Sequence, residues 1–421
     1  MDERSVLLTD LYQLTMAAGY FAAGKRTEIA TFDLFVRRLP PEREYLIAAG
    51  LAQAIEYLTQ VRFTAEEIAW LRKLPVMARA PSEFFTYLET WRFTGSVRAM
   101  PEGTVAFAGE PLLTVRAPII EAQIVETFLL ATISFQTMIA SKAARLVDLA
   151  QGRPVIEFGT RRAHSPSAGL FAARAAYIGG CSGTSNVLAG QRFGVPVYGT
   201  SAHSWILSFE DECEAFRQLQ HLLGPHTVQL VDTYDTAEGT ERAAAIGLPL
   251  AAVRIDSGDP IALSRDVRGI LDAAGLTEVK IMITGDLDEA KIAAIVAAHA
   301  PVDSFGVGTH LATSADAPAL AAVYKLVEYE SQGRVRYPEK RSPGKATIGG
   351  AKQVYRQAHR DLITGVAERA DGEPLLVNVI EDGQPTREAE SAASARERCA
   401  QRPRTPRTIE VSENLRAHRI L

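Results

Sequence analysis

Cysteine is scarce in this chain of 421 residues, and several kinds of site are absent with it. The three cysteines, Cys181, Cys213 and Cys399, stand far apart and form no CxxC pair. A disulfide framework and a cysteine-rich zinc site both require paired or closely spaced cysteines. We therefore expect neither in this protein.

An excess of positive charge and a long uncharged apolar run are also missing. The formal net charge is −5 at pH 7, which disfavours a nucleic-acid-binding protein because such proteins carry a basic surface. The most membrane-like stretch, residues 122–140, contains Gln123, Glu126 and Gln136, so it predicts a buried helix rather than a membrane span. The N-terminus lacks the apolar core of a signal peptide. We expect a cytoplasmic protein that binds neither nucleic acid nor a membrane.

Common catalytic and nucleotide-binding motifs are absent too. Neither a GxSxG elbow nor an HExxH pair occurs. The segment SPGKAT contains the Gly-Lys pair of a P-loop, but that loop would need glycine in place of Glu339 and serine or threonine in place of Ala346. The segment FGVGTH lacks the third glycine of a dinucleotide-binding loop. Phosphate binding, if it occurs, must use another arrangement.

From about residue 154 onward, short apolar runs end in glycine or polar residues, and a helix-like segment follows each. In chain order the runs are PVIEF, YIGGCSG, VPVYG, VQLVD, AAVRID, VKIMITGD and DSFGVG. Their ends lie roughly 20 to 30 residues apart, the length of one β-loop-α unit. This pattern predicts an α/β fold with an irregular (β/α) barrel, and an open doubly wound sheet is the alternative. A further run, AAVYKLVEY, could add a last strand.

The first part of the chain has a different pattern. A helix is predicted over residues 8–21, a strand in IATFDLFVRRL, a helix in YLIAAGLAQAIEYL, and antiparallel strands in FTGSVRAMPEGTVAFAGEPLLTVRAP. We therefore expect a separate N-terminal α+β domain. The expected division is an N-terminal domain over residues 1–120, a barrel with the active site over 121–330, and a C-terminal segment over 331–421 that packs back on the N-terminal domain.

Polar residues gather where the predicted strands end. Arginines and glycines suit phosphates, aspartates suit Mg²⁺ or a developing positive charge, and a histidine suits a nucleophile or general base. The spacing thus predicts an enzyme acting on a phosphorylated, metal-chelated substrate. Structural roles are open for some of them, namely helix capping for Asp259, and for Asp286 together with Asp288, and a tight turn for Gly306 and Gly308. The residues are Arg161, Arg162, His203, Asp232, Asp235, Arg254, Asp256, Asp259, Gly285, Asp286, Gly306 and Gly308.

The motifs LTDLYQLTMAAGYF, EFGTRRAHSP, GTSNVLAG, YGTSAHSW, VRIDSGDP and FGVGTHLAT occur in this order. Together they closely resemble the nicotinate phosphoribosyltransferase family, from about residue 6 to about residue 360. The resemblance implies a type II phosphoribosyltransferase fold, that is, an irregular (β/α) barrel with an N-terminal α+β domain. It implies that nicotinate and phosphoribosyl pyrophosphate give nicotinate mononucleotide and pyrophosphate in NAD salvage, coupled to ATP hydrolysis. It also implies Mg²⁺, ATP as co-substrate, and a homodimer with shared active sites.

The same resemblance implies roles for single residues. His203 matches the histidine that ATP phosphorylates transiently, and Asp232 and Asp256 match the other catalytic residues. Tyr12, lent by the neighbouring subunit, and Phe158 match the two walls around the pyridine ring. Mg²⁺ is expected on substrate phosphates rather than on protein side chains, and the SPGKAT loop is a further candidate for pyrophosphate or ATP. The full set of implied substrate-binding residues is Tyr12, Phe158, Arg161, Ser185, Thr200, Arg254, Gly285, Gly308 and Thr309.

Other functions on this fold stay open at this point. Nicotinamide phosphoribosyltransferases resemble this chain but carry an aspartate where GTSNVLAG has Ser185, and an aspartate would repel the carboxylate of nicotinate. Quinolinate, with two carboxylates, would call for a more basic pocket. A non-catalytic protein that binds NAD metabolites would have no need of the histidine.

Overall fold

The computed structural model describes residues 5–247, 249–342, 344–401 and 404–417. The chain divides into two compact units, Met1–Met138 with Ala319–Leu421, and Ile139–Pro318. We name them the antiparallel unit and the parallel unit after their main sheets. These divisions fall inside helix α6 (Glu126–Leu149) and before strand β12 (Ala322–Ser331), whereas the sequence suggested limits near residues 120 and 330, which remain a prediction. No helix in the described ranges is long and apolar enough to cross a membrane.

A parallel sheet forms the centre of the parallel unit. Within the described residues its strand order is β7-β6-β11-β10-β9-β8. The first strand of the unit therefore pairs with the last, and the strands follow a cyclic order that is interrupted between β7 and β8. A cyclic order is typical of a barrel, and the interruption makes the barrel irregular. The six strands are β6 (Val155–Glu157), β7 (Gly183–Thr184), β8 (Val228–Leu230), β9 (Ala252–Ile255), β10 (Lys280–Ile283) and β11 (Ser304–Val307).

The α/β fold with a parallel sheet is confirmed, although two of the predicted runs behave differently. VPVYG contributes a single bridge from Val197 to Thr184 beside β7. The prediction that AAVYKLVEY adds a strand to this set is wrong, because β12 pairs antiparallel with β1 (Ile29–Val36). Strands of a parallel sheet covered on both faces are apolar throughout, whereas β12 carries Lys325 and Glu328.

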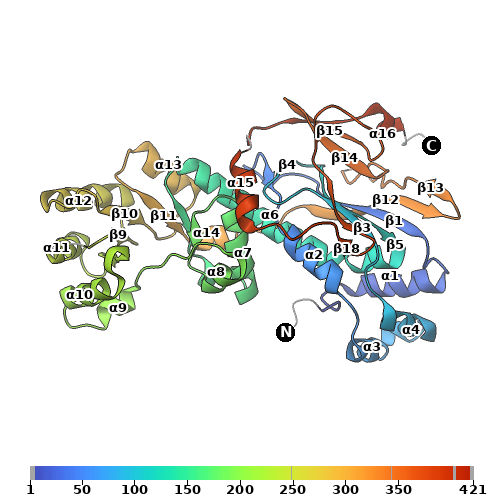
Figure 1. The fold of residues 1–421 in the computed structure, drawn as a ribbon, viewed down its shortest axis with the longest axis horizontal. Coiled ribbons are helices and arrows are strands. Elements are labelled where there is room, and N and C mark those ends of the chain that lie inside the picture. The colour runs from blue at the N-terminus through green and yellow to red at the C-terminus, as the bar shows by residue number, and fades with distance from the viewer. Residues whose placement is uncertain (1–4, 248, 343, 402–403, 418–421) are drawn as a thin grey trace. The chain divides into compact units, whose positions relative to one another are not determined.

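Helices follow the strands of the parallel unit, and many begin with a side-chain cap. Asp259 accepts a hydrogen bond from the amide of Ile261 at the start of α12, and α12 packs on β9 and β10 (Figure 1). Each strand end is thus followed by a short loop and a fixed helix. These elements are η2 (Thr160–Arg162), α7 (Pro166–Ile178), α8 (Val187–Phe193), α9 (His203–Leu207), α10 (Glu212–Leu223), η3 (Gly224–His226), α11 (Thr236–Ile246), α12 (Pro260–Ala273), α13 (Glu289–Ala297) and α14 (Thr309–Ala312).

Antiparallel sheets dominate the other unit. Its largest sheet, counted over the described residues, has the order β13-β12-β1-β5-β3-β17-β18. The remaining strands of that sheet are β3 (Ser96–Ala99), β5 (Pro111–Pro118), β13 (Arg334–Arg336), β17 (Val377–Glu381) and β18 (Gln384–Pro385). A second sheet has the order β16-β14-β15-β19, with β14 (Lys352–Arg356), β15 (Arg360–Gly365), β16 (Glu373–Pro374) and β19 (Thr408–Val411).

The predicted helix in YLIAAGLAQAIEYL is only partly correct. Its first part is strand β2 (Leu46–Ile47), which pairs with β4 (Val105–Ala106), and the helix α2 begins at Leu51. Gly50 separates the two with a left-handed backbone, φ 98°, which glycine adopts without strain. The other helical elements of this unit are α1 (Leu11–Ala22), α3 (Ala65–Leu71), η1 (Pro75–Met77), α4 (Ser82–Thr90), α5 (Ile119–Ile124), α15 (Ala392–Gln401) and α16 (Glu413–Ala417).

Candidate active site

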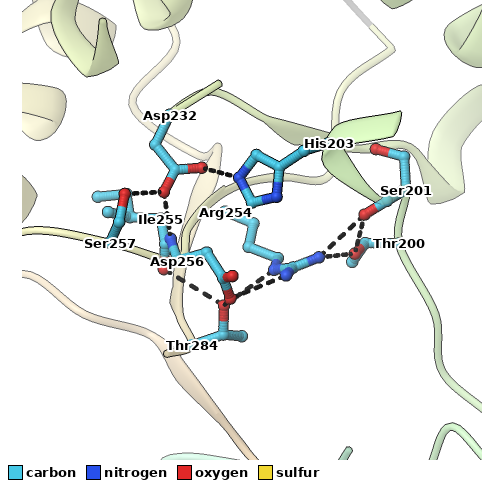
Figure 2. A network of polar contacts seen from close by, with 9 residues as sticks. All are labelled: Thr200, Ser201, His203, Asp232, Arg254, Ile255, Asp256, Ser257 and Thr284. Atoms are coloured by element: carbon cyan, nitrogen blue, oxygen red, sulfur yellow. Dashed lines mark hydrogen bonds and ion pairs between the residues drawn. The ribbon is translucent and has the colours of Figure 1, made fainter. Parts of the chain in front are cut away.

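Arg254 lies at the centre of a polar network where β8, β9 and β10 end (Figure 2). Its Nε donates to Thr284 Oγ1 at 2.9 Å, and its Nη1 donates to Thr200 Oγ1 at 2.6 Å. Its Nη2 pairs with Asp256 Oδ1 at 2.8 Å. Because all three guanidinium nitrogens have partners, the side chain is fixed in one position between the strand ends.

His203 and Asp232 form the second half of the network. Nε2 of His203 lies 3.2 Å from Oδ1 of Asp232, so in the neutral ring this contact favours the tautomer with its proton on Nε2 and the lone pair on Nδ1. The other oxygen of Asp232 accepts the amide of Asp256 at 2.9 Å and the hydroxyl of Ser257 at 2.6 Å. The side chain of Asp232 is 1% exposed and that of His203 is 39% exposed. The buried carboxylate of Asp232 therefore fixes the orientation of the imidazole, and the exposed part of the ring is accessible to a ligand.

Asp256 is an ionised carboxylate in this setting. Burial raises its pKa, but the hydrogen bonds from Arg254 and Thr284 and the charge of Arg254 outweigh burial, so its pKa lies below the usual value. A carboxylate that is charged at neutral pH can stabilise positive charge that develops on a substrate.

A cavity of about 250 Å³ lies between the ends of β9 and β10. Its lining includes Asp256, Gly285 and Lys291. Gly285 has φ 88°, and a Cβ there would clash with the carbonyl oxygen of Asp256. Glycine is thus required where the two loops meet, whether or not a phosphate contacts it.

The ends of β6, β7 and β11 bring a second group of predicted residues together. The amide of Phe158 donates to the carbonyl of Val307 at 2.8 Å. A Cβ on Gly306 would lie 2.6 Å from Cδ2 of Phe158, so the glycine leaves room for the ring. At Gly308 a Cβ would lie 3.4 Å from the carbonyl oxygen of Phe158, an ordinary contact. Gly306 therefore has a packing role, whereas packing against Phe158 does not require glycine at position 308. Ser185 follows β7 and Thr309 begins α14.

Arg161 and Arg162 lie on the η2 turn that follows Phe158, and both are exposed. Neither guanidinium pairs with a carboxylate in the part of the chain that the structure describes. Two exposed guanidiniums close in sequence to Phe158 suit an anion, because a guanidinium binds a carboxylate or phosphate through two parallel hydrogen bonds.

Tyr12 is the predicted site residue that belongs to the antiparallel unit. It lies on α1, its ring is 48% exposed, and its hydroxyl donates to Glu126 Oε1 at 3.2 Å. Burial and the charge of Glu126 raise the pKa of Tyr12 to about 12. Its contribution to an active site remains a prediction. In the SPGKAT loop, Pro343 lies outside the described residues.

Sequence reasoning did not single out four residues of these networks. Ser257 stands inside the VRIDSGDP motif and could have been found there. Glu157 and Thr184 also stand inside quoted motifs, EFGTRRAHSP and GTSNVLAG, and Thr284 stands in the run VKIMITGD, but a single polar residue at a strand end is common and does not by itself indicate a role. Over the described ranges, no group of three or more His, Cys, Asp or Glu side chains is placed to hold a metal ion.

Known proteins resemble this chain along most of its length. Residues 7–134 match the nicotinate phosphoribosyltransferase N-terminal domain, and residues 154–341 match the nicotinate phosphoribosyltransferase family. Nicotinate phosphoribosyltransferase pncB2 of Mycobacterium tuberculosis is 45% identical over 393 residues, 91% of this chain and 83% of the relative. Nicotinate phosphoribosyltransferase of Bacillus subtilis is 43% identical over 364 residues, 84% of this chain and 74% of the relative.

Solved structures extend the likeness to the fold. The crystal structure of human nicotinic acid phosphoribosyltransferase aligns with a TM-score of 0.81 at 28% identity, covering 97% of this chain and 98% of the human one. The structure described as nicotinate-nucleotide pyrophosphorylase from Pyrococcus furiosus gives a TM-score of 0.77, also at 28% identity and with 93% of each chain covered. The second family match spans the strand ends that carry His203, Arg254 and Asp256, and with these relatives it places the chain among the enzymes of the nicotinate phosphoribosyltransferase family.

Proposed function

We propose that this protein transfers the 5-phosphoribosyl group of phosphoribosyl pyrophosphate to nicotinate, giving nicotinate mononucleotide and pyrophosphate in cytoplasmic NAD salvage. We further propose that ATP hydrolysis is coupled to this transfer through His203. The observation that supports the proposal best is the network of Figure 2, in which a buried carboxylate orients an accessible imidazole beside an arginine–aspartate pair. The family to which the chain belongs supplies the substrate class.

His203 has the geometry of a nucleophile toward ATP. Nδ1 attacks the γ-phosphorus, the N–P bond forms, and the bond from that phosphorus to the bridging oxygen breaks, so that ADP leaves with the electron pair. Asp232 stabilises the positive charge that develops on the ring, and its position is fixed by Asp256 and Ser257. Water later cleaves the N–P bond, which releases phosphate and restores the imidazole.

Transfer itself calls for stabilisation of a ribosyl cation. The bond from C1 of the ribose to pyrophosphate breaks with the electron pair going to pyrophosphate, and the ring nitrogen of nicotinate forms the new bond to C1. Asp256 is the charged carboxylate available to stabilise C1, and Arg254 keeps it ionised and in place. Phe158 would stack on the pyridine ring, and Arg161 would bind the carboxylate of nicotinate.

Mg²⁺ enters this scheme with the substrates. In the described part of the chain no cluster of His, Cys, Asp or Glu could hold the ion alone. Mg²⁺ binds phosphate oxygens and water readily, so phosphoribosyl pyrophosphate and ATP would bring it to the site. The open backbone at Gly308 and the hydroxyl of Thr309 are available to phosphate oxygens.

A homodimer with shared sites is also part of the proposal. Leu11, Tyr12 and Met16 lie on α1, Leu8 lies just before the helix, and each is 37% to 48% exposed. An exposed apolar stripe of this kind suits a surface covered by another chain. Tyr12 would then reach the base site of the neighbouring subunit.

The test of the proposed function is an assay with three bases. Purified protein receives phosphoribosyl pyrophosphate, Mg²⁺ and nicotinate, nicotinamide or quinolinate, with and without ATP. We expect mononucleotide from nicotinate and faster synthesis with ATP. Preference for nicotinamide would instead indicate the amide-using enzyme, and calorimetry that detects base binding without turnover would indicate a non-catalytic protein.

The variant His203→Ala tests the coupling. It should lose ATP hydrolysis and the stimulation of synthesis by ATP, while slow uncoupled transfer continues, because Asp256 and the base-binding residues remain. His221→Ala, at an exposed position on α10, is the matched control and should behave as the wild type. Full ATPase activity in His203→Ala would contradict the assignment.

A further inference from the structure

Glu157 is a fully buried carboxylate to which the proposed reaction gives no role. It is the last residue of β6, its exposure is 0%, and burial raises its pKa. No lysine, arginine or histidine forms an ion pair with it within the described residues. A buried carboxylate without a cationic partner is costly unless hydrogen bonds stabilise it.

The hydrogen bonds of Glu157 join two loops. Oε1 accepts the amide of Gly159, in the loop after β6. Oε2 accepts the hydroxyl of Thr184, at the end of β7, at 2.5 Å. The main-chain oxygen of Glu157 accepts the amide of Ser185 at 2.9 Å. One residue thus contacts the loop that carries Phe158 and the loop that carries Ser185.

Further hydrogen bonds close this connection into a ring. The hydroxyl of Thr184 accepts the amide of Asn186 at 3.0 Å, and Nδ2 of Asn186 donates to Thr160 Oγ1 at 3.2 Å. Thr160 precedes Arg161, so the ring returns to the first loop. The β6 loop and the β7 loop are therefore held to each other on both sides of Phe158.

The loop after β11 contacts the same point. A Cβ on Gly159 would lie 2.7 Å from the carbonyl oxygen of Gly308 and 2.8 Å from Oε1 of Glu157. Gly159 is therefore enclosed between the carboxylate and the third loop. A shift of the Gly159 amide would therefore move Phe158, and it would bring Gly159 into steric contact with the carbonyl oxygen of Gly308.

We propose that Glu157 is a positioning residue of the base site, whose carboxylate holds Phe158, Arg161 and Ser185 in the geometry that selects nicotinate over nicotinamide. This inference rests on the proposed function. Glu157 accepts from an amide N–H at one oxygen and from a hydroxyl at the other. Glutamine keeps one acceptor for the Gly159 amide, but its NH2 group would face Thr184 Oγ1, which already accepts the amide of Asn186 and would have to accept a second bond in place of the one it donates.

Steady-state kinetics of Glu157→Gln and Thr184→Val test this inference. Each variant should raise KM for nicotinate about tenfold, the effect of one lost hydrogen bond to a charged group. KM for phosphoribosyl pyrophosphate should rise much less than KM for nicotinate, because Glu157 hydrogen-bonds directly to the loops of Phe158 and Ser185 and touches the loop of Gly308 only through Gly159. The preference for nicotinate over nicotinamide should fall. Thr184→Ser keeps the hydroxyl and should restore most of the nicotinate affinity.

Glu121→Gln is the matched control. Glu121 is also a buried carboxylate with a pKa raised by burial, and it accepts the amide of Thr94 at 2.6 Å and the hydroxyl of Thr94 at 3.0 Å. It belongs to the antiparallel unit. Its substitution should lower the melting temperature to a similar degree as Glu157→Gln, with both KM values unchanged.

The outcomes separate this inference from the proposed function. A wild-type protein that neither binds nor uses nicotinate would overturn the proposed function and this inference with it. If the wild type uses nicotinate, and Glu157→Gln leaves its KM unchanged or raises both KM values equally, only the positioning role fails. If Glu157→Gln does not fold, the two Thr184 variants decide instead. Equal KM values for nicotinate in Thr184→Val and Thr184→Ser would then contradict the positioning role of Glu157.

Discussion

The two carboxylate oxygens of Asp232 have different roles: one is held by the loop after β9, and the other contacts the proposed nucleophile His203. Oδ2 accepts from Ser257 and from the amide of Asp256, and Oδ1 faces His203 (Figure 2). Two contacts from another strand end fix the carboxylate before it orients the imidazole. Supporting contacts of this kind hold a reactive side chain within the narrow range of positions that catalysis requires.

Ser185→Asp is the prediction for base selection. Serine is neutral, whereas an aspartate in this half-buried position would repel the carboxylate of nicotinate and could accept from the amide of nicotinamide. We expect kcat/KM for nicotinate to fall by about tenfold or more and the relative use of nicotinamide to rise. The measurement is a pair of steady-state assays, one with each base.

Ser185→Asn separates charge from size in that experiment. It has nearly the same volume as the aspartate variant but no charge, so the nicotinate reaction should suffer less. If nicotinate kinetics were the same in wild type and Ser185→Asp, Ser185 would not line the base site.

Among the elements of the parallel unit, α6, α13 and the segment after α14 are joined by four charges. Nζ of Lys142 lies 2.6 Å from Glu289 and 2.8 Å from Asp316, and Arg145 lies 3.2 Å and 3.0 Å from the same two carboxylates. Glu289 begins α13 after the loop that contains Gly285, and Asp316 follows α14, whose N-cap is Gly308. The network therefore anchors two loops of the site to one helix.

Lys142→Met should destabilise the protein strongly. The side chain of Lys142 is 1% exposed, so its removal leaves two partly buried carboxylates with one arginine, at a cost of about 3 to 5 kcal/mol in the free energy of unfolding. Urea unfolding measures this cost. Lys280→Met is the control, because Lys280 is 59% exposed and lies 3.4 Å from Asp303. That change should cost about 1 kcal/mol or less, and an equally small loss for Lys142→Met would contradict the anchoring role.

A second buried charge group lies in the antiparallel unit. Asp361 pairs with Arg356 and, at 2.8 Å, with Arg407, while Glu110 accepts the amide of Phe107 at 2.8 Å. Burial and the negative charge of Asp361 raise the pKa of Glu110 well above its usual value. Burial opposes ionisation of Asp361, but Arg356 outweighs it and lowers the pKa. Of the two carboxyl groups, Glu110 therefore keeps its proton to the higher pH.

This assignment predicts a pH dependence of stability. Because the pKa of Glu110 is higher in the folded than in the unfolded protein, its contribution is fully present below the unfolded value and is lost as pH rises through the folded value. The glutamine of Glu110→Gln cannot lose a proton. The melting temperature of this variant, minus that of the wild type, should therefore increase as pH rises from about 5 to about 9. A constant difference across this range would mean that Glu110 does not titrate in the folded protein.

The strand ends of the parallel unit, and with them His203, Asp232 and Arg254, follow from local patterns in the sequence. Each apolar run is short and followed by a polar residue, and parallel strands bring those residues to one edge. The strand that pairs with AAVYKLVEY cannot be predicted from local patterns, because a strand pattern does not identify the neighbouring strand. Glu157 and Lys142 were missed for a similar reason, since their burial depends on segments distant in the sequence.

For the whole molecule, the exposed residues of α1 are where we propose that a second chain packs. If Tyr12 closes the base site of a neighbouring subunit, two different defects should compensate each other. Tyr12→Ala and His203→Ala proteins would each have little ATP-coupled activity. After mixing in equal amounts and reassortment, half of the dimers are mixed and each has one intact site, so about a quarter of wild-type activity should return.

Two controls accompany this experiment. Tyr12→Ala must keep its melting temperature and its dimeric size, and Tyr12→Phe should stay active, since it loses the bond to Glu126 but keeps the ring. A verified mixed dimer with no recovered activity would mean that Tyr12 serves its own chain or only packs.

The pairing of β1 with β12 has a consequence for how the protein is made. β5 can join one edge of β1 soon after it is synthesised, but the other edge waits for β12, whose register runs from Ile29↔Glu330 to Val36↔Ala322. The ribosome must first complete all of Ile139–Pro318. Domains fold as units during synthesis, so the later-encoded unit can finish folding while the earlier one is still incomplete. During that interval the open edge of β1 needs protection, because unpaired strand edges invite aggregation.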